Sequence, residues 1–124
     1  MEPTYKDLLV SLSDITPEEA YNELQENPNH ELKEQYEFII KKDPGYTYLY
    51  ALDVIKGRWP EAEEIIKTDP YRAYRYAKNI IKGRWQEAEE YIKKDTYYAC
   101  EYANEVIKDE NFWEKNYAHA QIKN

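Results

Sequence analysis

A repeat of 26 residues is the feature that most limits how this chain can fold. Residues 44–69 (PGYTYLYALDVIKGRWPEAEEIIKTD) and 70–95 (PYRAYRYAKNIIKGRWQEAEEYIKKD) are identical at 16 of 26 positions without a gap. A third copy begins at Thr96, loses the glycine and gains two residues before Trp113. Residues 34–43 match the second half of a further copy. Units of this length are stable only when neighbouring units bury each other's apolar faces.

Each copy carries the signals of two short helices. The Asp–Pro pairs at 43–44 and 69–70 mark helix starts, because Asp caps free N–H groups and Pro fits the first turn. Apolar residues follow at the period of a helix, and a Trp–Ala–Ile face marks the second helix. Gly57 and Gly83 are expected to close the first helix in the left-handed conformation. We therefore predict an all-α fold, in which short helical hairpins stack as a small right-handed α-solenoid of about eight helices.

The remaining residues are predicted to form divergent units of the same kind, so that residues 1–124 make a single domain. We divide it into acidic N-terminal helices (1–43), two copies (44–69 and 70–95) and a divergent capping copy (96–124). Thr16 to Glu19 form a capping box, and Asn29 is expected to cap a further helix. The expected apolar faces at the two ends comprise Leu8, Leu9 and Leu12 at one end and Trp113, Tyr117 and Ala120 at the other.

The charge is unevenly placed along the chain. Residues 1–37 hold ten acidic and two basic side chains, whereas residues 38–124 hold fifteen of each, so the net charge of -8 lies in the first part. Such a field repels nucleic acid and steers a basic partner, although a solubilising surface is the favoured interpretation. No run approaches the roughly 20 apolar residues of a membrane span, and the first three residues lack the features of a secretory signal. We expect a cytoplasmic protein without membrane contact.

Signatures of enzyme chemistry are mostly absent. His30 and His119 stand at opposite ends of the array, and no H-x-x-x-H or C-x-x-C spacing for zinc occurs. Ser11 and Ser13 have no base near them in sequence. Cys100 is expected to be a small core residue, since it replaces a tyrosine of the buried face. The repeated glutamates are expected in first turns, with Glu–Lys pairs at 63/67 and 89/93. We therefore expect no enzyme, no metal and no cofactor.

Three groups of side chains are candidates for binding a partner. The first copy is apolar where the second has a basic stripe, so its first helix is apolar nearly all round. We expect the N-terminal helices to cover this face; the alternative is an exposed patch for a partner. The basic stripe is expected to pair with glutamates, with base stacking beside tyrosines as its competing use. The three groups are apolar (Tyr46, Leu49, Leu52), basic (Arg72, Arg75, with Lys78) and acidic (Glu18, Glu19, Glu23, Glu26).

The pattern YA-x-x-(I/V)-I-K-G-R-W-(P/Q)-E-A-E occurs in residues 50–64 and 76–90. It resembles a tandem repeat of uncharacterised proteins from tailed bacteriophages and some bacteria, over about residues 34–117. The third copy departs from this pattern at Asp109 and Glu110, where Gly and Arg are expected. The resemblance implies helical repeats and a phage origin, but no activity.

Because small phage proteins often modulate host proteins, we predict a protein-binding module that inhibits or redirects a bacterial host or defence protein. Two alternatives stay open. One is an acidic mimic of nucleic acid, in which a row of glutamates occupies a DNA- or RNA-binding cleft. The other is a structural protein that assembles into homo-oligomers through the ends of the stack. The glutamates of the predicted row are Glu18, Glu19, Glu23, Glu26, Glu31, Glu34 and Glu37.

Overall fold

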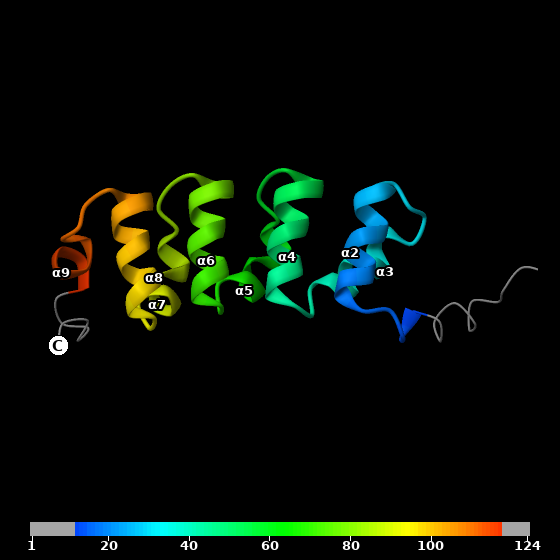
Figure 1. The fold of residues 1–124 in the computed structure, drawn as a ribbon, viewed down its shortest axis with the longest axis horizontal. Coiled ribbons are helices and arrows are strands. Elements are labelled where there is room, and N and C mark those ends of the chain that lie inside the picture. Colours follow the sequence, from blue (N-terminus) through cyan, green and yellow to red (C-terminus); the bar gives the residue numbers. More distant parts are fainter. Residues whose placement is uncertain (1–11, 118–124) are drawn as a thin grey trace, which may run out of the picture.

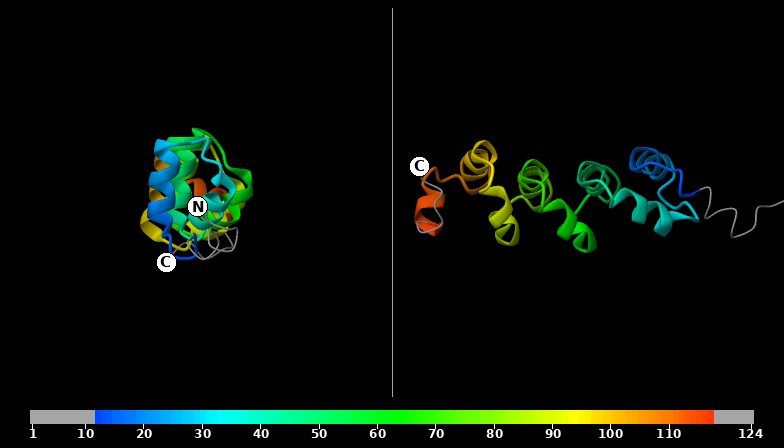
Figure 2. Two further views of the ribbon diagram at one scale, coloured as in Figure 1. Left: turned by 90° about the vertical axis from the view of Figure 1, so that its right-hand side faces the viewer. Right: turned by 90° about the horizontal axis from the view of Figure 1, so that it is seen from below.

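The computed structural model describes residues 12–117, and within them the chain forms eight α-helices and no strand. Helices α2, α4, α6 and α8 stand side by side in one elongated row (Figure 1), and the helix that follows each of them lies to one side of that row (Figure 2). Each pair packs on the next pair along the chain. The predicted fold of stacked hairpins with a 26-residue period is confirmed.

The helices of the row are the first helices of the hairpins: α2 (Pro17–Glu26), α4 (Pro44–Tyr50), α6 (Pro70–Tyr76) and α8 (Thr96–Glu101). The second helices are α3 (Lys33–Ile40), α5 (Glu63–Ile66), α7 (Glu89–Ile92) and α9 (Phe112–Tyr117). Wider π-helical turns continue the first helices of the three copies: η1 (Ala51–Ile55), η3 (Ala77–Ile81) and η5 (Tyr102–Ile107). Two 3-10 turns precede second helices: η2 (Pro60–Ala62) and η4 (Gln86–Ala88). No helix within residues 12–117 is long and apolar enough to cross a membrane.

The helix starts follow the sequence signals closely. Asp43 and Asp69 accept hydrogen bonds from the free N–H groups of α4 and α6, and Asp95 does the same for α8. Thr16 and Glu19 form the reciprocal capping box of α2. The prediction for Asn29 is wrong, because α3 begins only at Lys33. The chain before α3 turns through a hydrogen bond of 2.9 Å from the N–H of Leu32 to Nδ1 of His30. Leu8, Leu9 and Ala120 lie outside the described residues.

The helix ends differ from the prediction. Lysines close the first helices in the left-handed conformation: Lys56, Lys82 and Lys108, with φ of 61°, 62° and 66°. Neither Gly57 nor Gly83 has a positive φ. The N–H groups of Lys56 and Gly57 both reach the carbonyl of Ala51, at 2.7 and 3.2 Å. These two hydrogen bonds to one carbonyl close the π turn. The left-handed residue therefore lies one position before the glycine.

The core repeats one aromatic contact in each copy. The ring of Tyr50 lies 4.9 Å from that of Trp59, and the ring of Tyr76 lies 4.8 Å from that of Trp85. In the third copy Tyr102 contacts both Phe112 and Trp113. The tryptophans are buried, as their predicted helical face requires.

A polar cluster joins each copy to the next. Tyr76 accepts a hydrogen bond from the N–H of Trp59 at 2.8 Å and donates one to Glu63 at 2.7 Å. Arg58 donates two bonds of 2.9 Å to the same carboxylate. Burial alone would raise the pKa of Glu63, but the bonds from Arg58 and Tyr76 hold its net pKa below the usual value.

The second junction repeats this cluster with Arg84, Glu89 and Tyr102. The predicted Glu–Lys pairs at 63/67 and 89/93 are wrong, because both glutamates turn toward the next copy. The lysines pair three residues back instead, Lys67 with Glu64 at 3.1 Å and Lys93 with Glu90 at 2.9 Å.

Candidate functional site

The apolar face of the first copy is covered by α2. Tyr46, Leu49 and Leu52 are half-buried and pack against the core. The rings of Tyr21 and Tyr46 lie 5.7 Å apart, and the Tyr21 hydroxyl donates to Asp53 at 2.7 Å. Burial and the Asp53 carboxylate raise the pKa of Tyr21 to about 12. The expected cover by N-terminal helices holds at Tyr46, whereas Leu52 lines a groove that faces the next copy.

The basic stripe on α6 is held mainly by aromatic rings. The guanidinium groups of Arg72 and Arg75 lie 4.7 and 5.6 Å from the centre of the Tyr71 ring. No carboxylate of residues 12–117 forms an ion pair with either arginine. The expected pairing with glutamates is therefore wrong for both, because their side chains turn back onto Tyr71. It holds for Lys78, which lies 3.6 Å from Glu105.

The acidic candidates lie exposed on α2. Glu18, Glu19, Glu23 and Glu26 form no ion pair with any lysine or arginine of residues 12–117. Glu19 is engaged in the capping box, and Glu23 lies 3.7 Å from Nε2 of His30. Glutamates of the later copies do find partners: Lys41–Glu61, Lys67–Glu64 and Lys93–Glu90. Among residues 12–117, the negative charge of α2 is thus left largely uncompensated by lysine or arginine.

Cys100 is exposed, contrary to the prediction of a core position. Its counterparts Tyr48 and Tyr74 reach across to the next copy, Tyr48 by accepting a 2.9 Å hydrogen bond from Asn79 and Tyr74 by stacking on Tyr98. Within the described residues α8 packs against α6 of the preceding copy, but no following first helix packs against its other side, where Tyr48 and Tyr74 make their contacts in the earlier copies.

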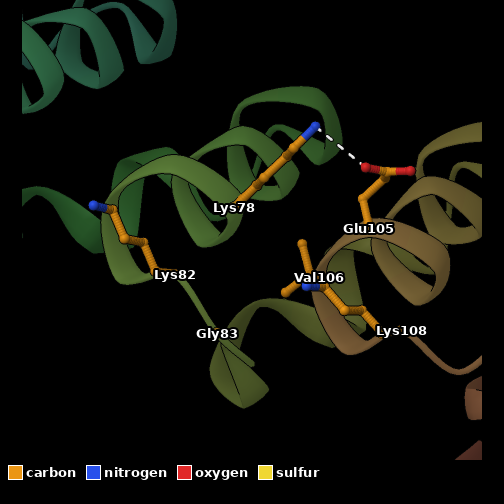
Figure 3. A pocket seen from close by; sticks show the side chains of 6 residues that line it. All are labelled: Lys78, Lys82, Gly83, Glu105, Val106 and Lys108. Carbon is orange, nitrogen blue, oxygen red and sulfur yellow. Dashed lines mark ion pairs between the residues drawn. The ribbon is translucent and has the colours of Figure 1, made fainter.

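Two grooves of the same construction open where the end of one first helix meets the next first helix. Their volumes are about 240 and 210 Å³. Each residue of the second groove stands 26 positions after its counterpart in the first, and Lys82 lines both. Figure 3 shows the second groove, with the Lys78–Glu105 ion pair joining its two helices. The linings are Leu52, Lys56, Gly57, Asn79, Ile80 and Lys82, then Lys78, Lys82, Gly83, Glu105, Val106 and Lys108.

The three left-handed lysines form a row along these grooves. Lys56, Lys82 and Lys108 are exposed, and no carboxylate of residues 12–117 forms an ion pair with them. The left-handed backbone costs a residue with a Cβ about 1–2 kcal/mol. A lysine regains only about 0.3–1 kcal/mol from the negative end of the helix dipole. Helix closure alone therefore does not explain why this position carries lysine in all three copies.

The glycines of the grooves are also unexplained by the fold. A Cβ built on Gly57 or Gly83 would meet no atom within 4 Å, and neither glycine has a positive φ. The third copy has Asp109 at this position, and its N–H makes the equivalent bond to Ala103 at 2.9 Å. Sequence reasoning missed this site, although a signal existed: the lysine is present in three copies and the glycine in two.

We name the two grooves and their row of lysines the grooved edge. It offers ammonium groups, aliphatic walls and accessible backbone, which bind a partner through charge and shape. Among residues 12–117, no three His, Cys, Asp or Glu side chains gather closely enough to hold a metal ion. No family model, curated protein or solved structure matches the chain.

Proposed function

We propose that the protein is a protein-binding helical-repeat module that recognises its partner along the grooved edge. The observation that carries this proposal is the exact repetition of the groove at two successive junctions, with the same residue positions and a shared lysine. Side chains set at a fixed repeat on stacked hairpins form the extended binding surface that repeat proteins use.

The junction clusters support the proposal, because they hold neighbouring copies in one register. Each cluster ties the arginine and glutamate of one copy to the tyrosine of the next copy through short hydrogen bonds. A surface that is already ordered loses little conformational entropy when a partner binds. The spacing of the two grooves is therefore set before the partner arrives.

The resemblance of the repeat to phage proteins favours a bacterial host or defence protein as the partner. In that setting the module works in the host cytoplasm. It inhibits or redirects its target by steric occlusion, which requires a preformed surface and no reactive group.

A capture experiment from bacterial lysate tests the proposal. The full chain is compared with the double variant Gly57→Leu/Gly83→Leu, which fills both grooves without a clash at Cβ. Asp109→Leu is the matched control, since it lies at the equivalent position outside the two grooves. We expect a specific protein that the full chain and the control capture and the double variant loses. Equal capture by all three would contradict the role of the grooved edge.

A second candidate function is mimicry of nucleic acid by the acidic end. The specific observation in its favour is that the exposed glutamates of α2 form no ion pair with a lysine or arginine among the described residues. Mimicry predicts a captured nucleic-acid-binding protein that is lost in high salt and after charge reversal at Glu18, Glu19 and Glu23. Capture that survives both changes would exclude the mimic.

A further inference from the structure

Building on the proposed function, we propose that the occupant of the grooved edge is an extended, acidic peptide segment of the partner. Its carboxylates pair with Lys56, Lys82 and Lys108, and its backbone passes over Gly57 and Gly83. Two independent features of the structure lead to this assignment: the conformation of the lysines and the position of the glycines.

The lysines stand where a glycine would serve helix closure better. A left-handed residue with a Cβ is disfavoured, yet the chain places lysine there in all three copies. The three ammonium groups are left without a carboxylate partner in the described part of the chain. Strain that recurs together with an unpaired charge indicates a use for the side chain beyond the fold.

The glycines occur where a groove exists and are absent where none follows. Gly57 lines the first groove and Gly83 the second, whereas the third copy, with no further first helix packed against it in residues 12–117, has Asp109. Since neither φ nor packing demands a glycine at the two positions, the missing side chain serves to leave the groove open. An open backbone of this kind admits the close approach of another backbone.

The linings favour a peptide over a nucleic acid. The walls are aliphatic or amide groups, such as Leu52, Ile80 and Asn79, and no aromatic ring lines either groove. Binding of single strands relies on aromatic rings for base stacking, which these grooves lack. The first groove holds two lysines and no carboxylate. In the second, Glu105 is taken up by Lys78.

The spacing of the lysines fits an extended chain. Packed helices lie about 8–10 Å apart, and an extended peptide in the polyproline II conformation advances about 3.1 Å per residue with three residues per turn. A carboxylate at every third residue therefore stays on one face and meets successive lysines, and the residues between them place small or aliphatic side chains against the groove walls.

The test measures binding of a fluorescent peptide of four Val-Glu-Ser triplets to the full chain at an ionic strength of about 0.1 M, where the Debye length is about 10 Å. The peptide control carries Gln in place of Glu. The triple variant Lys56→Gln/Lys82→Gln/Lys108→Gln removes the row of lysines. The matched variant Lys33→Gln/Lys42→Gln/Lys94→Gln removes the same charge from exposed lysines outside the grooves. We expect the row variant to weaken binding about tenfold, since each exposed pair contributes modestly. The matched variant should change binding less than about twofold, because distant charges are screened.

Three outcomes would overturn this inference: no binding of the acidic peptide, equal loss in both triple variants, or preferential binding of oligo(dT) that depends on the row of lysines. The last would replace the peptide by a single-stranded nucleic acid. The inference and the proposed function fail separately. A lysate protein that depends on open grooves but binds the row variant normally would leave the proposed function standing and refute the acidic peptide.

Discussion

Three glutamates at equivalent repeat positions offer a graded test of how the copies are joined. Glu37, Glu63 and Glu89 stand 26 residues apart, and each accepts a hydrogen bond of 2.7 Å from the tyrosine thirteen residues further along. Their surroundings differ in a defined order. Changing each to Gln, which keeps the volume and removes the charge, therefore compares one chemistry in three environments.

The environments differ in burial and in the number of bonds from described residues. Glu37 is half-buried and accepts its bond from Tyr50. The side chain of Glu63 is 16% exposed and accepts three bonds, two from an arginine and one from a tyrosine. The side chain of Glu89 is 0% exposed and accepts four bonds. The donors to Glu89 are Arg84 (two bonds), Tyr102 and Tyr117.

The expected losses follow from these contacts. Glu89→Gln places an amide donor where a fully buried carboxylate accepts four bonds, which costs about 3–5 kcal/mol. Glu63→Gln should cost about 1–3 kcal/mol, because the carboxylate of Glu63 is partly exposed and accepts three bonds. Glu37→Gln should cost about 0.5–1.5 kcal/mol, the net value of one hydrogen bond.

Urea denaturation followed by circular dichroism measures the series, with the exposed Glu87→Gln as the control expected to change stability by less than about 0.5 kcal/mol. The order Glu89, Glu63, Glu37 is the essential result. Equal losses at the three positions, or a larger loss at Glu37 than at Glu89, would refute the assignment of the junction clusters as the contacts that hold the copies together.

Three further predictions concern stability. Trp85→Ala should cost about 3–5 kcal/mol in the same urea assay; a loss below about 1 kcal/mol would mean that the ring is not a core residue. Burial and the bonds to glutamate raise the pKa of Tyr76 and Tyr102 above the ordinary value of about 10. Since the fold favours the protonated phenols, their stabilisation is complete below about pH 10 and is lost as pH rises through the raised pKa values. Thermal melts should therefore show Tm falling above that pH, together with tyrosinate absorbance, and a constant Tm would contradict this. Gly83→Ala should leave the free energy of unfolding unchanged or raise it by about 0.4–1 kcal/mol, because Gly83 has no positive φ. A marked fall in Tm would show that the glycine is the left-handed residue.

The parts of the fold that depend on neighbouring residues in sequence were predictable. Asp–Pro pairs, the capping box at Thr16 and the Trp–Ala–Ile faces act within one or two turns, and the structure has them where the pattern placed them. The position of the left-handed residue was not predictable, because a π turn shifts the closure of the helix by one residue. Glycine at a helix end normally marks closure, and here that rule pointed to the wrong residue.

The candidate site was harder to predict, because it depends on contacts between copies. The glutamates at 63 and 89 have lysines four residues later, so a local rule pairs them, whereas the structure turns them toward a tyrosine of the next copy. Likewise, Cys100 replaces a tyrosine whose role is to reach the following copy. Neither contact can be recognised from the helical periodicity of one segment, because both join residues of different copies.

Comparison among the three copies nevertheless separates the two kinds of residue. Lysine at 56, 82 and 108 is kept in every copy, and each of the three lines a groove, Lys108 the second one. Glycine and arginine occur at 57–58 and 83–84, but Asp109 and Glu110 replace them in the third copy. The glycine and the arginine, together with the tyrosine that Cys100 replaces, all act at a junction with a following first helix. Within residues 12–117, no following first helix packs against α8. The glycine is present in the two copies that are followed by another first helix and absent from the third, which is not followed by one in the described residues. We therefore assign the glycines to the grooves between copies and not to the end of the helix.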